Sequence, residues 1–151
     1  PVMGICNGFQ ILLEAGLIPG AMMHNQKLKF VCKDVFIRCE TTNSLFTNSL
    51  EKGQVFDIPV SHGEGNYFID QNGLKSLQDN DQVLFRYSNA NGELTEEANF
   101  NGLIDSIAGI CNTGRNVLGM MPHPERAMEK ILGSEDGKPI FESILNALSV
   151  A

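Results

Sequence analysis

The chain has 151 residues and a formal net charge of −7 at pH 7. This length predicts one domain with a sizeable core, and the acidic balance argues against nucleic acid or an acidic membrane surface as the main partner. No run of about 18 apolar residues predicts a transmembrane helix, and no basic-then-apolar leader is visible, which fits a cytoplasmic protein. Because Pro1 opens what reads as a core strand, we expect that the natural chain has a further N-terminal part.

The first twenty residues organise the predicted domain. Residues 1–5 read as a buried strand, Cys6 stands in a sharp turn, and residues 7–15 read as a short helix closed by Gly16. A Gly-x-nucleophile-x-Gly frame, here Gly4 to Gly8, is typical of a nucleophile elbow, in which each glycine removes a Cβ that would clash. The helix start offers free N–H groups and a positive dipole end, both of which favour a thiolate. The alternative is a buried structural cysteine at a tight turn, and spacing alone favours neither.

Hydropathy patterns along the rest of the chain predict mixed helices and strands, which indicates an α/β sheet domain. Strands are predicted at residues 30–40, 56–60, 83–87, 104–112 and 117–121, of which the last two form a hairpin. Helical segments are predicted at residues 74–81, 127–132 and 138–148, the last with an apolar stripe of Ile140, Ile144 and Leu148 beside Phe141 and Leu145. Loops are predicted at residues 24–29, 41–53, 61–66 and 88–102. Two close glycines argue against a strand at 61–66.

The other three cysteines, Cys32, Cys39 and Cys111, lie in strand-like runs and are predicted to be small core residues. No cysteine belongs to a C-x-x-C pair, and the chain has only three histidines. These counts predict neither a structural zinc site nor a disulfide framework.

A thiol with a pKa near 8.5 needs a base at neutral pH. His123 is the best candidate because it follows a strand that could lie beside residues 1–5, so that both strand ends would emerge at one edge. Pro122 and Pro124 stiffen its loop, and Glu125, two residues on, could accept a hydrogen bond from the imidazole. For this motif alone, a rigid surface loop with a Glu125–Arg126 ion pair is the favoured alternative.

Two further positions could serve a site at Cys6. Gln10 lies one helical turn after Cys6, where its amide could read the polar end of a substrate, although an exposed helical glutamine is the usual case. His62 and Glu64 could be a second acid/base pair, but their glycine neighbours indicate that backbone contact matters more, and we expect the Glu64 side chain to be solvated.

Three motifs together carry a resemblance to a known family. They are Gly4-Ile5-Cys6-Asn7-Gly8-Phe9-Gln10, Ser61-His62-Gly63-Glu64-Gly65-Asn66, and Met120-Met121-Pro122-His123-Pro124-Glu125-Arg126. With the run Leu17-Ile18-Pro19-Gly20-Ala21, they resemble the class I, or triad, glutamine amidotransferases, and among them the glutaminase subunits of formylglycinamide ribonucleotide amidotransferase. The resemblance implies a class I glutamine amidotransferase-like (flavodoxin-like) mixed sheet with flanking helices. Residues 1–151 would be the C-terminal portion of a single glutaminase domain, with the N-terminal part of the sheet missing.

The resemblance also implies roles for particular residues. Cys6 would be the nucleophile that attacks the side-chain amide of glutamine, His123 the base, and Glu125 the group that orients it. Asn7, through its backbone N–H in the oxyanion hole, and Gly8, Gln10 and His62 would bind the substrate. No metal is implied. A glycine-rich loop that gives family members a second oxyanion donor has no counterpart in this chain, so we expect reduced activity in isolation.

For the function, the resemblance implies that glutamine is hydrolysed to glutamate and ammonia in de novo purine biosynthesis. The ammonia would pass to a large synthetase subunit that uses ATP and magnesium, with a small subunit bridging the two in many bacteria. This subunit itself would need no cofactor. Two alternatives stay open: a cysteine hydrolase of the protease or chaperone type, which Gln10 disfavours, and a non-catalytic interaction module.

Overall fold

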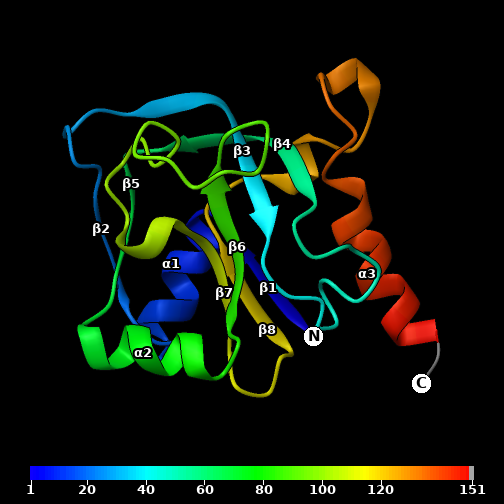
Figure 1. The fold of residues 1–151 in the computed structure, drawn as a ribbon, viewed down its shortest axis with the longest axis horizontal. Helices are drawn as coiled ribbons and strands as arrows, with labels where there is room; N and C mark the ends of the chain where they lie inside the picture. Colours follow the sequence, from blue (N-terminus) through cyan, green and yellow to red (C-terminus); the bar gives the residue numbers. More distant parts are fainter. Residues whose placement is uncertain (150–151) are drawn as a thin grey trace.

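A computed structural model describes residues 1–149 of the chain and shows one mixed sheet with helices around it (Figure 1). The six-stranded sheet has the order β1-β8-β7-β6-β3-β4, and a separate two-stranded sheet pairs β2 with β5. The strands are β1 (Val2–Ile5), β2 (Ala21–His24), β3 (Val31–Cys39), β4 (Val55–His62), β5 (Glu64–Phe68), β6 (Val83–Ser88), β7 (Ile107–Cys111) and β8 (Val117–Met120). The predicted α/β mixed sheet with flanking helices is therefore confirmed.

One strand pair decides where the candidate site forms. β1 and β8 run parallel, with Ile5 opposite Met120, whereas every other described pair in the large sheet is antiparallel. The carboxyl ends of β1 and β8 therefore meet at the same edge of the sheet. Cys6 follows the first strand and His123 follows the second, as the sequence predicts.

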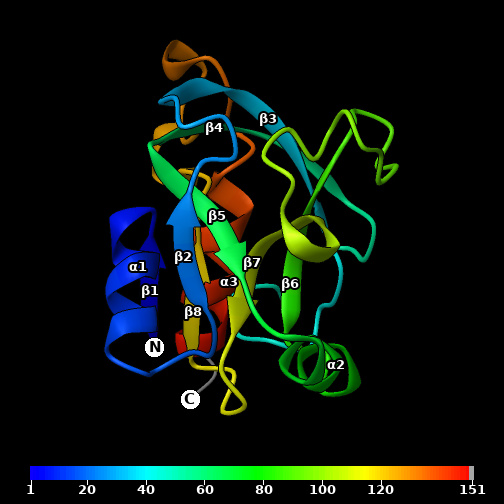
Figure 2. The same ribbon diagram turned by 90° about the vertical axis from the view of Figure 1, so that its left-hand side faces the viewer.

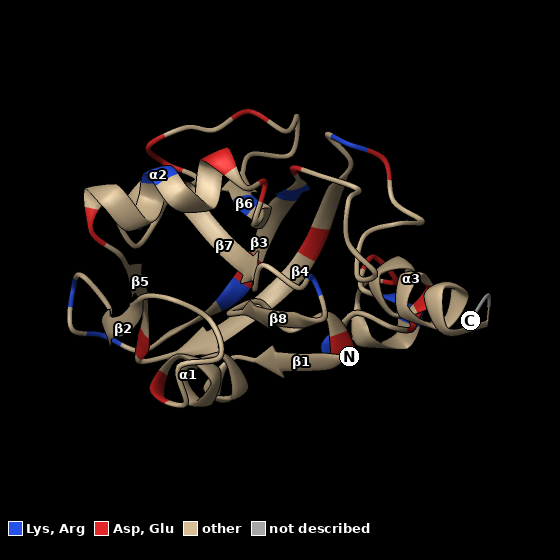
Figure 3. Cartoon of the chain, turned by 90° about the horizontal axis from the view of Figure 1, so that it is seen from below, with Lys and Arg blue, Asp and Glu red and all other residues tan. Residues whose placement is uncertain are grey.

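Three α-helices and three short 3-10 helices complete the described fold. They are α1 (Asn7–Glu14), α2 (Gln71–Asp79), α3 (Lys138–Ser149), η1 (Ile104–Ser106), η2 (Pro124–Arg126) and η3 (Lys130–Leu132). α1 packs on β1 and β8 and next to β2, whereas α3 lies well away from it (Figures 1 and 3). The closing helix buries Ile140, but Leu145 and Leu148 stay exposed, so the predicted apolar stripe is only partly covered.

Glycines in the sheet let α1 approach the strands closely. A Cβ on Gly119 would lie 2.6 Å from Ile18 Cδ1 and against the ring of Phe9, so a larger residue would displace the helix. Phe9 is fully buried, and its ring stacks on Tyr67 of β5 with 5.6 Å between the ring centroids. The small β2–β5 sheet thus lies beside α1, as Figure 2 shows, and closes the core there.

Several predicted elements need correction. Residues 61–66 are not a loop, because β4 runs to His62 and β5 begins at Glu64. Gly65 serves a close approach instead of a turn, since a Cβ there would collide with the His62 imidazole. β2 lies where no strand was predicted, whereas residues 41–53 form the predicted loop. Cys32 is exposed near the start of β3, so its prediction as a core residue is wrong, whereas Cys39 and Cys111 are buried.

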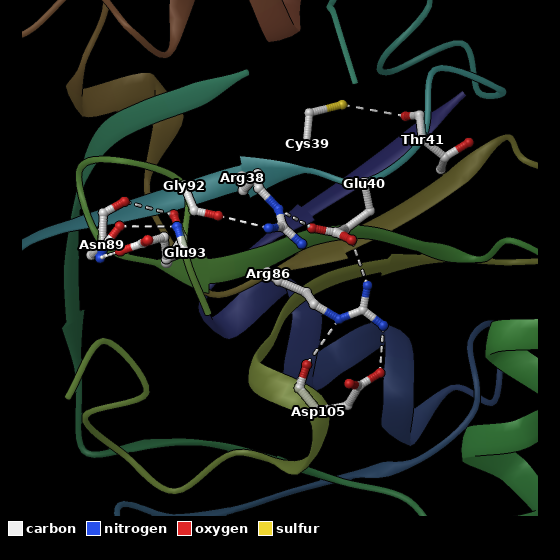
Figure 4. A network of polar contacts seen from close by, with 10 residues as sticks. Arg38, Cys39, Glu40, Thr41, Arg86, Asn89, Gly92, Glu93 and Asp105 are labelled. Carbon is white, nitrogen blue, oxygen red and sulfur yellow. Dashed lines mark hydrogen bonds and ion pairs between the residues drawn. The ribbon is translucent and has the colours of Figure 1, made fainter. Parts of the chain in front are cut away.

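A chain of ion pairs anchors the long loop between β6 and β7 (Figure 4). Arg86 Nη1 lies 2.7 Å from Glu40 Oε2, and Arg86 also binds the side chain and the carbonyl of Asp105. Arg38 donates to Glu40 Oε1 at 2.7 Å and to the Gly92 carbonyl at 2.6 Å. The loop is thus fixed near its start, at Gly92, and near its end, at Asp105.

Positions of both charge signs lie on several elements of the ribbon in the view of Figure 3. Within residues 1–149, none of the helices has the length and apolar character needed to cross a bilayer.

Candidate active site at the β1–α1 elbow

Cys6 occupies a strained turn between β1 and α1. Its φ of 53° and ψ of −108° lie in a region that residues other than glycine rarely adopt, which costs on the order of 1–3 kcal/mol. The Cys6 N–H donates to the Met120 carbonyl at 2.8 Å, and its own carbonyl accepts from Phe9 N–H at 3.0 Å in the first turn of α1. The residue is therefore held by the sheet on one side and by the helix on the other, which is the geometry of a nucleophile elbow.

The two glycines of the elbow differ in what they do. A Cβ on Gly4 would lie 2.5 Å from Leu12 Cδ1 and 2.6 Å from the Gly8 carbonyl oxygen, so Gly4 is required by packing. A Cβ on Gly8 would have no atom within 4 Å. The prediction that both glycines avoid clashes is right for Gly4 and wrong for Gly8, which faces open space at the helix start.

This difference predicts opposite effects of alanine on stability. Gly4→Ala should lower the free energy of unfolding by about 1–3 kcal/mol through overpacking. Gly8→Ala should leave it unchanged or raise it by up to about 1 kcal/mol, because alanine favours the helix. Urea unfolding of the two variants measures both values, and equal losses in the two would contradict the steric assignment.

The Cys6 thiol is neutral by preference in this arrangement. Burial raises the pKa of the thiol, and this outweighs the lowering by the Asn7 N–H and the Arg126 guanidinium, while Glu125 raises the pKa further. The Sγ–H donates to the Ser61 carbonyl, with 3.5 Å between sulfur and oxygen. The helix start acts in the predicted direction but does not ionise the thiol alone, so a base is needed.

His123 stands at the same sheet edge in a form suited to accept a proton. Its backbone N–H donates to the Pro59 carbonyl at 2.8 Å, and its ring Nδ1 lies 2.5 Å from Glu125 Oε1. An ionised carboxylate accepts only, so Nδ1 carries the proton and Nε2 has a free lone pair. Nε2 is buried and has no hydrogen-bond partner among the described residues. The alternative Glu125–Arg126 ion pair is also present, at 3.7 Å.

The structure gives the other predicted residues specific contacts. Gln10 Nε2 donates to the Glu64 carbonyl at 2.8 Å and so links α1 to β5. His62 is buried and its Nδ1 lies 2.8 Å from Asn25 Oδ1. Glu64 is exposed, as predicted, and lies 3.3 Å from His24 Nδ1. The catalytic roles of Cys6, His123 and Glu125 and the binding roles of Asn7, Gly8, Gln10 and His62 remain predictions.

Sequence reasoning missed three residues near this site. Asn25 and Asn101 are 1% and 2% exposed, although both fall in segments predicted to be surface loops. Tyr87 is fully buried at the end of a correctly predicted strand, and its ring lies edge-on to Phe100, which stacks on His62. Asparagine is typical of loops, so the sequence holds no signal that Asn25 and Asn101 are buried.

The buried state of His62 predicts a loss of stability in mild acid. Burial, followed by the charge of His123, lowers the pKa of His62 to about 4, whereas an unfolded histidine titrates near 6.5. Above pH 6.5 neither state is protonated, but as the pH falls toward 4 only the unfolded state gains the proton. We expect a loss of about 2 kcal/mol by pH 5 from this group. Urea unfolding at pH 7 and pH 5 measures this loss in the free energy of unfolding. In His62→Gln the loss should be smaller by that amount, whereas His24→Gln, which changes an exposed histidine, should lose as much as the unsubstituted chain. An equal pH dependence would contradict the assignment.

No group of three or more metal-ligating side chains is placed to hold a metal within the described part of the chain.

A cysteine in an elbow, a histidine after the adjacent parallel strand and a carboxylate beside that histidine are the side chains that cysteine hydrolases combine in a triad. The chain belongs to the CobB/CobQ-like glutamine amidotransferase domain family, whose model matches residues 2–139. This confirms the class that the sequence motifs indicate.

Individual proteins show which members of the family the chain is similar to. The chain is 56% identical over 149 residues to phosphoribosylformylglycinamidine synthase subunit PurQ of Salinibacter ruber, covering 99% of this chain and 63% of that protein. It is 57% identical over 148 residues to the subunit of the same name from Koribacter versatilis, covering 98% and 64%. A chain in the structure of PurLQS from Thermotoga maritima matches with a TM-score of 0.81 and 45% identity, covering 97% and 61%. The chain thus spans less than two thirds of the length of these relatives.

Proposed function

We propose that the chain carries the glutaminase centre of a phosphoribosylformylglycinamidine synthase and hydrolyses glutamine through a thioester on Cys6. The observation that supports this most directly is the strained Cys6 at the same sheet edge as His123, whose Nδ1 lies 2.5 Å from Glu125. The family match and the names of the relatives supply the reaction class.

In the first half-reaction His123 Nε2 takes the proton of the Cys6 thiol, and the sulfur attacks the side-chain carbonyl carbon of glutamine. The Asn7 N–H, which already faces the sulfur, donates to the developing oxyanion. His123 then gives its proton to the amide nitrogen, the C–N bond breaks, and ammonia leaves. Glu125 holds the Nδ1–H tautomer and stabilises the imidazolium.

In the second half-reaction His123 takes a proton from water, whose oxygen attacks the γ-glutamyl thioester. The C–S bond breaks, glutamate leaves, and the proton returns to the Cys6 sulfur. The free lone pair of His123 Nε2 and its burial suit both proton transfers.

We also propose the partners that this chemistry needs. Similarity to a chain of PurLQS supports assembly with a large synthetase chain and a small third chain. The synthetase would use ATP and magnesium with the ammonia to form formylglycinamidine ribonucleotide, and the glutaminase chain would need no cofactor. The whole assembly would work in the cytoplasm.

The thioester is the direct test. The protein with its synthetase partner is mixed with glutamine, quenched in acid and analysed by peptide mass spectrometry. We expect one γ-glutamyl group on the peptide that contains Cys6, and labelling of the same residue by a glutamine-like diazoketone. Release of glutamate with no acyl group on Cys6 would refute the mechanism. Absence of both glutamate and acyl group would support the non-catalytic alternative.

A further inference from the structure

The loop between β2 and β3, residues 25–30, presents two large apolar side chains to solvent. Leu28 is 80% exposed and Phe30 is 67% exposed, at the outer edge of the fold beyond the end of β2 (Figure 1). Of the large apolar residues that the structure describes, only Ile131, at 89%, is more exposed than Leu28. Single exposed apolar residues are normal in a soluble protein, whereas neighbouring ones mark contact surfaces.

Hydrogen bonds from a buried asparagine hold this loop in place. Asn25 is 1% exposed, and its backbone N–H donates to the Gly63 carbonyl at 3.0 Å. Its Nδ2 donates to the carbonyls of Lys29 and His62, both at 2.7 Å. Leu28 N–H closes a turn by donating to the Asn25 carbonyl at 2.8 Å. Both ends of the loop are thus fixed to the end of β4, so binding through this loop has little ordering entropy to overcome.

Leu28 adopts a backbone conformation that leucine does not favour. Its φ of 52° lies in the left-handed region, where glycine and asparagine are common and other residues are not. Asparagine would fit this turn better and would not expose an apolar side chain. Neither the strain nor the exposure of Leu28 stabilises the chain by itself, which favours a role in contact with another molecule.

The same loop is basic, although the chain is acidic. Lys27 and Lys29 flank Leu28, and no aspartate or glutamate occurs in residues 15–33, whereas the whole chain has a net charge of −7. The lysines that form ion pairs within residues 1–149 are Lys75, Lys130 and Lys138. Lys27 and Lys29 are therefore available to carboxylates of another molecule, and complementary charge of this kind orients and speeds association.

The loop lies against the end of the strand that faces Cys6. A Cβ on Gly63 would lie 3.7 Å from Phe30 Cδ2, so the phenyl ring lies beside the end of β4. Ser61, two residues earlier, accepts the proton of the Cys6 thiol at its carbonyl. A molecule that contacts Phe30 therefore lies next to the elbow.

We propose that residues 25–30 dock the synthetase chain. Leu28 and Phe30 enter an apolar recess of that chain, and carboxylates on the rim of the recess meet Lys27 and Lys29. The inference rests on the partner named in the proposed function. The apolar pair forms the centre of the contact and the lysines its rim, which is how protein interfaces divide affinity and orientation. Docking at this edge also places the synthetase beside the elbow, where the product it consumes is released.

Leu28→Asn separates docking from folding, because asparagine tolerates the left-handed backbone and removes the apolar contact. The full chain is titrated with its purified synthetase chain in a calorimeter, and the melting temperature is measured on the same preparation. We expect Kd to rise at least about tenfold while the melting temperature stays the same or rises. Ile131→Asn is the matched control. That isoleucine is exposed on η3, on the opposite side of the fold (orange in Figure 1), and its loss should leave Kd unchanged.

The double variant Lys27→Glu, Lys29→Glu tests the charged part of the contact. Binding of the unsubstituted chain should weaken as NaCl rises from about 50 to 500 mM, and the double variant should lose most of this dependence. Lys52→Glu, which reverses an exposed lysine between β3 and β4, should keep it.

An unchanged Kd in Leu28→Asn, or an equal rise in Ile131→Asn, would overturn the inference. A loss of self-association, or of binding to phosphatidylserine vesicles, with unchanged affinity for the synthetase would also overturn it, since the loop would then serve a second copy or a membrane. Failure of the unsubstituted chain to bind the synthetase would refute both the partner and this inference. A complex that shows the effect of Leu28→Asn but hydrolyses no glutamine would refute the proposed function alone.

Discussion

Cys6→Ala in the complete complex should reduce glutamine hydrolysis by at least about 10⁴-fold, because Cys6 is the cysteine of the elbow on which the proposed thioester forms. Synthesis from added ammonium chloride should remain, since that reaction bypasses the elbow. Both rates are measured on one preparation, as glutamate released and as product formed. Alanine is close in size to cysteine and leaves the bonds from Cys6 N–H to Met120 and from Phe9 to the Cys6 carbonyl in place.

Cys32→Ala is the matched control for this substitution. Cys32 is a free and exposed cysteine on β3, so its loss should change neither rate. Removing it also leaves Cys6 as the only cysteine that is not buried, which simplifies labelling by the diazoketone. Glutamine hydrolysis that survives in Cys6→Ala would refute the assignment of the nucleophile.

The sequence was sufficient to predict the elbow and the position of its partner histidine. Glycines around Cys6 and the run of apolar residues before it are local signals of a strand, a turn and a helix. The prediction that His123 follows a strand beside β1 also required two strands that are distant in the chain to be paired. The parallel register of Ile5 with Met120 confirms that pairing. Such a step succeeds because buried strands carry a strong hydropathy pattern.

Contacts between loops were beyond the reach of that reasoning. Asn25 and Asn101 are far apart in the chain and typical of turns, yet they meet over His62 and bond to each other. Residues 61–66 were wrongly predicted to be a loop because of Gly63 and Gly65. The sequence does not distinguish a glycine that makes room for a neighbouring ring from a glycine that makes a turn. Cys32 was wrongly predicted to be a core residue, because the alternation of apolar and polar residues does not show which part of a strand extends beyond the core.

The raised pKa of the thiol links the fold to the mechanism. Burial at the elbow keeps Cys6 protonated in the resting protein and the Ser61 carbonyl holds its proton, which limits side reactions of the sulfur. In the proposed mechanism, ionisation of the thiol then depends on His123, and His123 depends on the proton that Glu125 holds at Nδ1. The carboxylate of Glu125 should therefore have an effect far larger than its half-exposed position suggests.

Glu125→Gln should lower kcat for glutamine hydrolysis by about 10²–10⁴-fold with little change in KM. A carboxamide can present its N–H₂ to His123 Nδ1 and so move the imidazole proton to Nε2, where it blocks the base. Loss of the Glu125 charge should have the opposite effect on activity. Glu125 raises the pKa of the thiol, so its removal should make Cys6 easier to ionise. A fall in kcat with unchanged or faster alkylation of Cys6 would show that orientation of His123 outweighs charge. Glu135→Gln, on the neighbouring surface turn, is the matched control, and an equal loss of activity in both variants would contradict the role of Glu125.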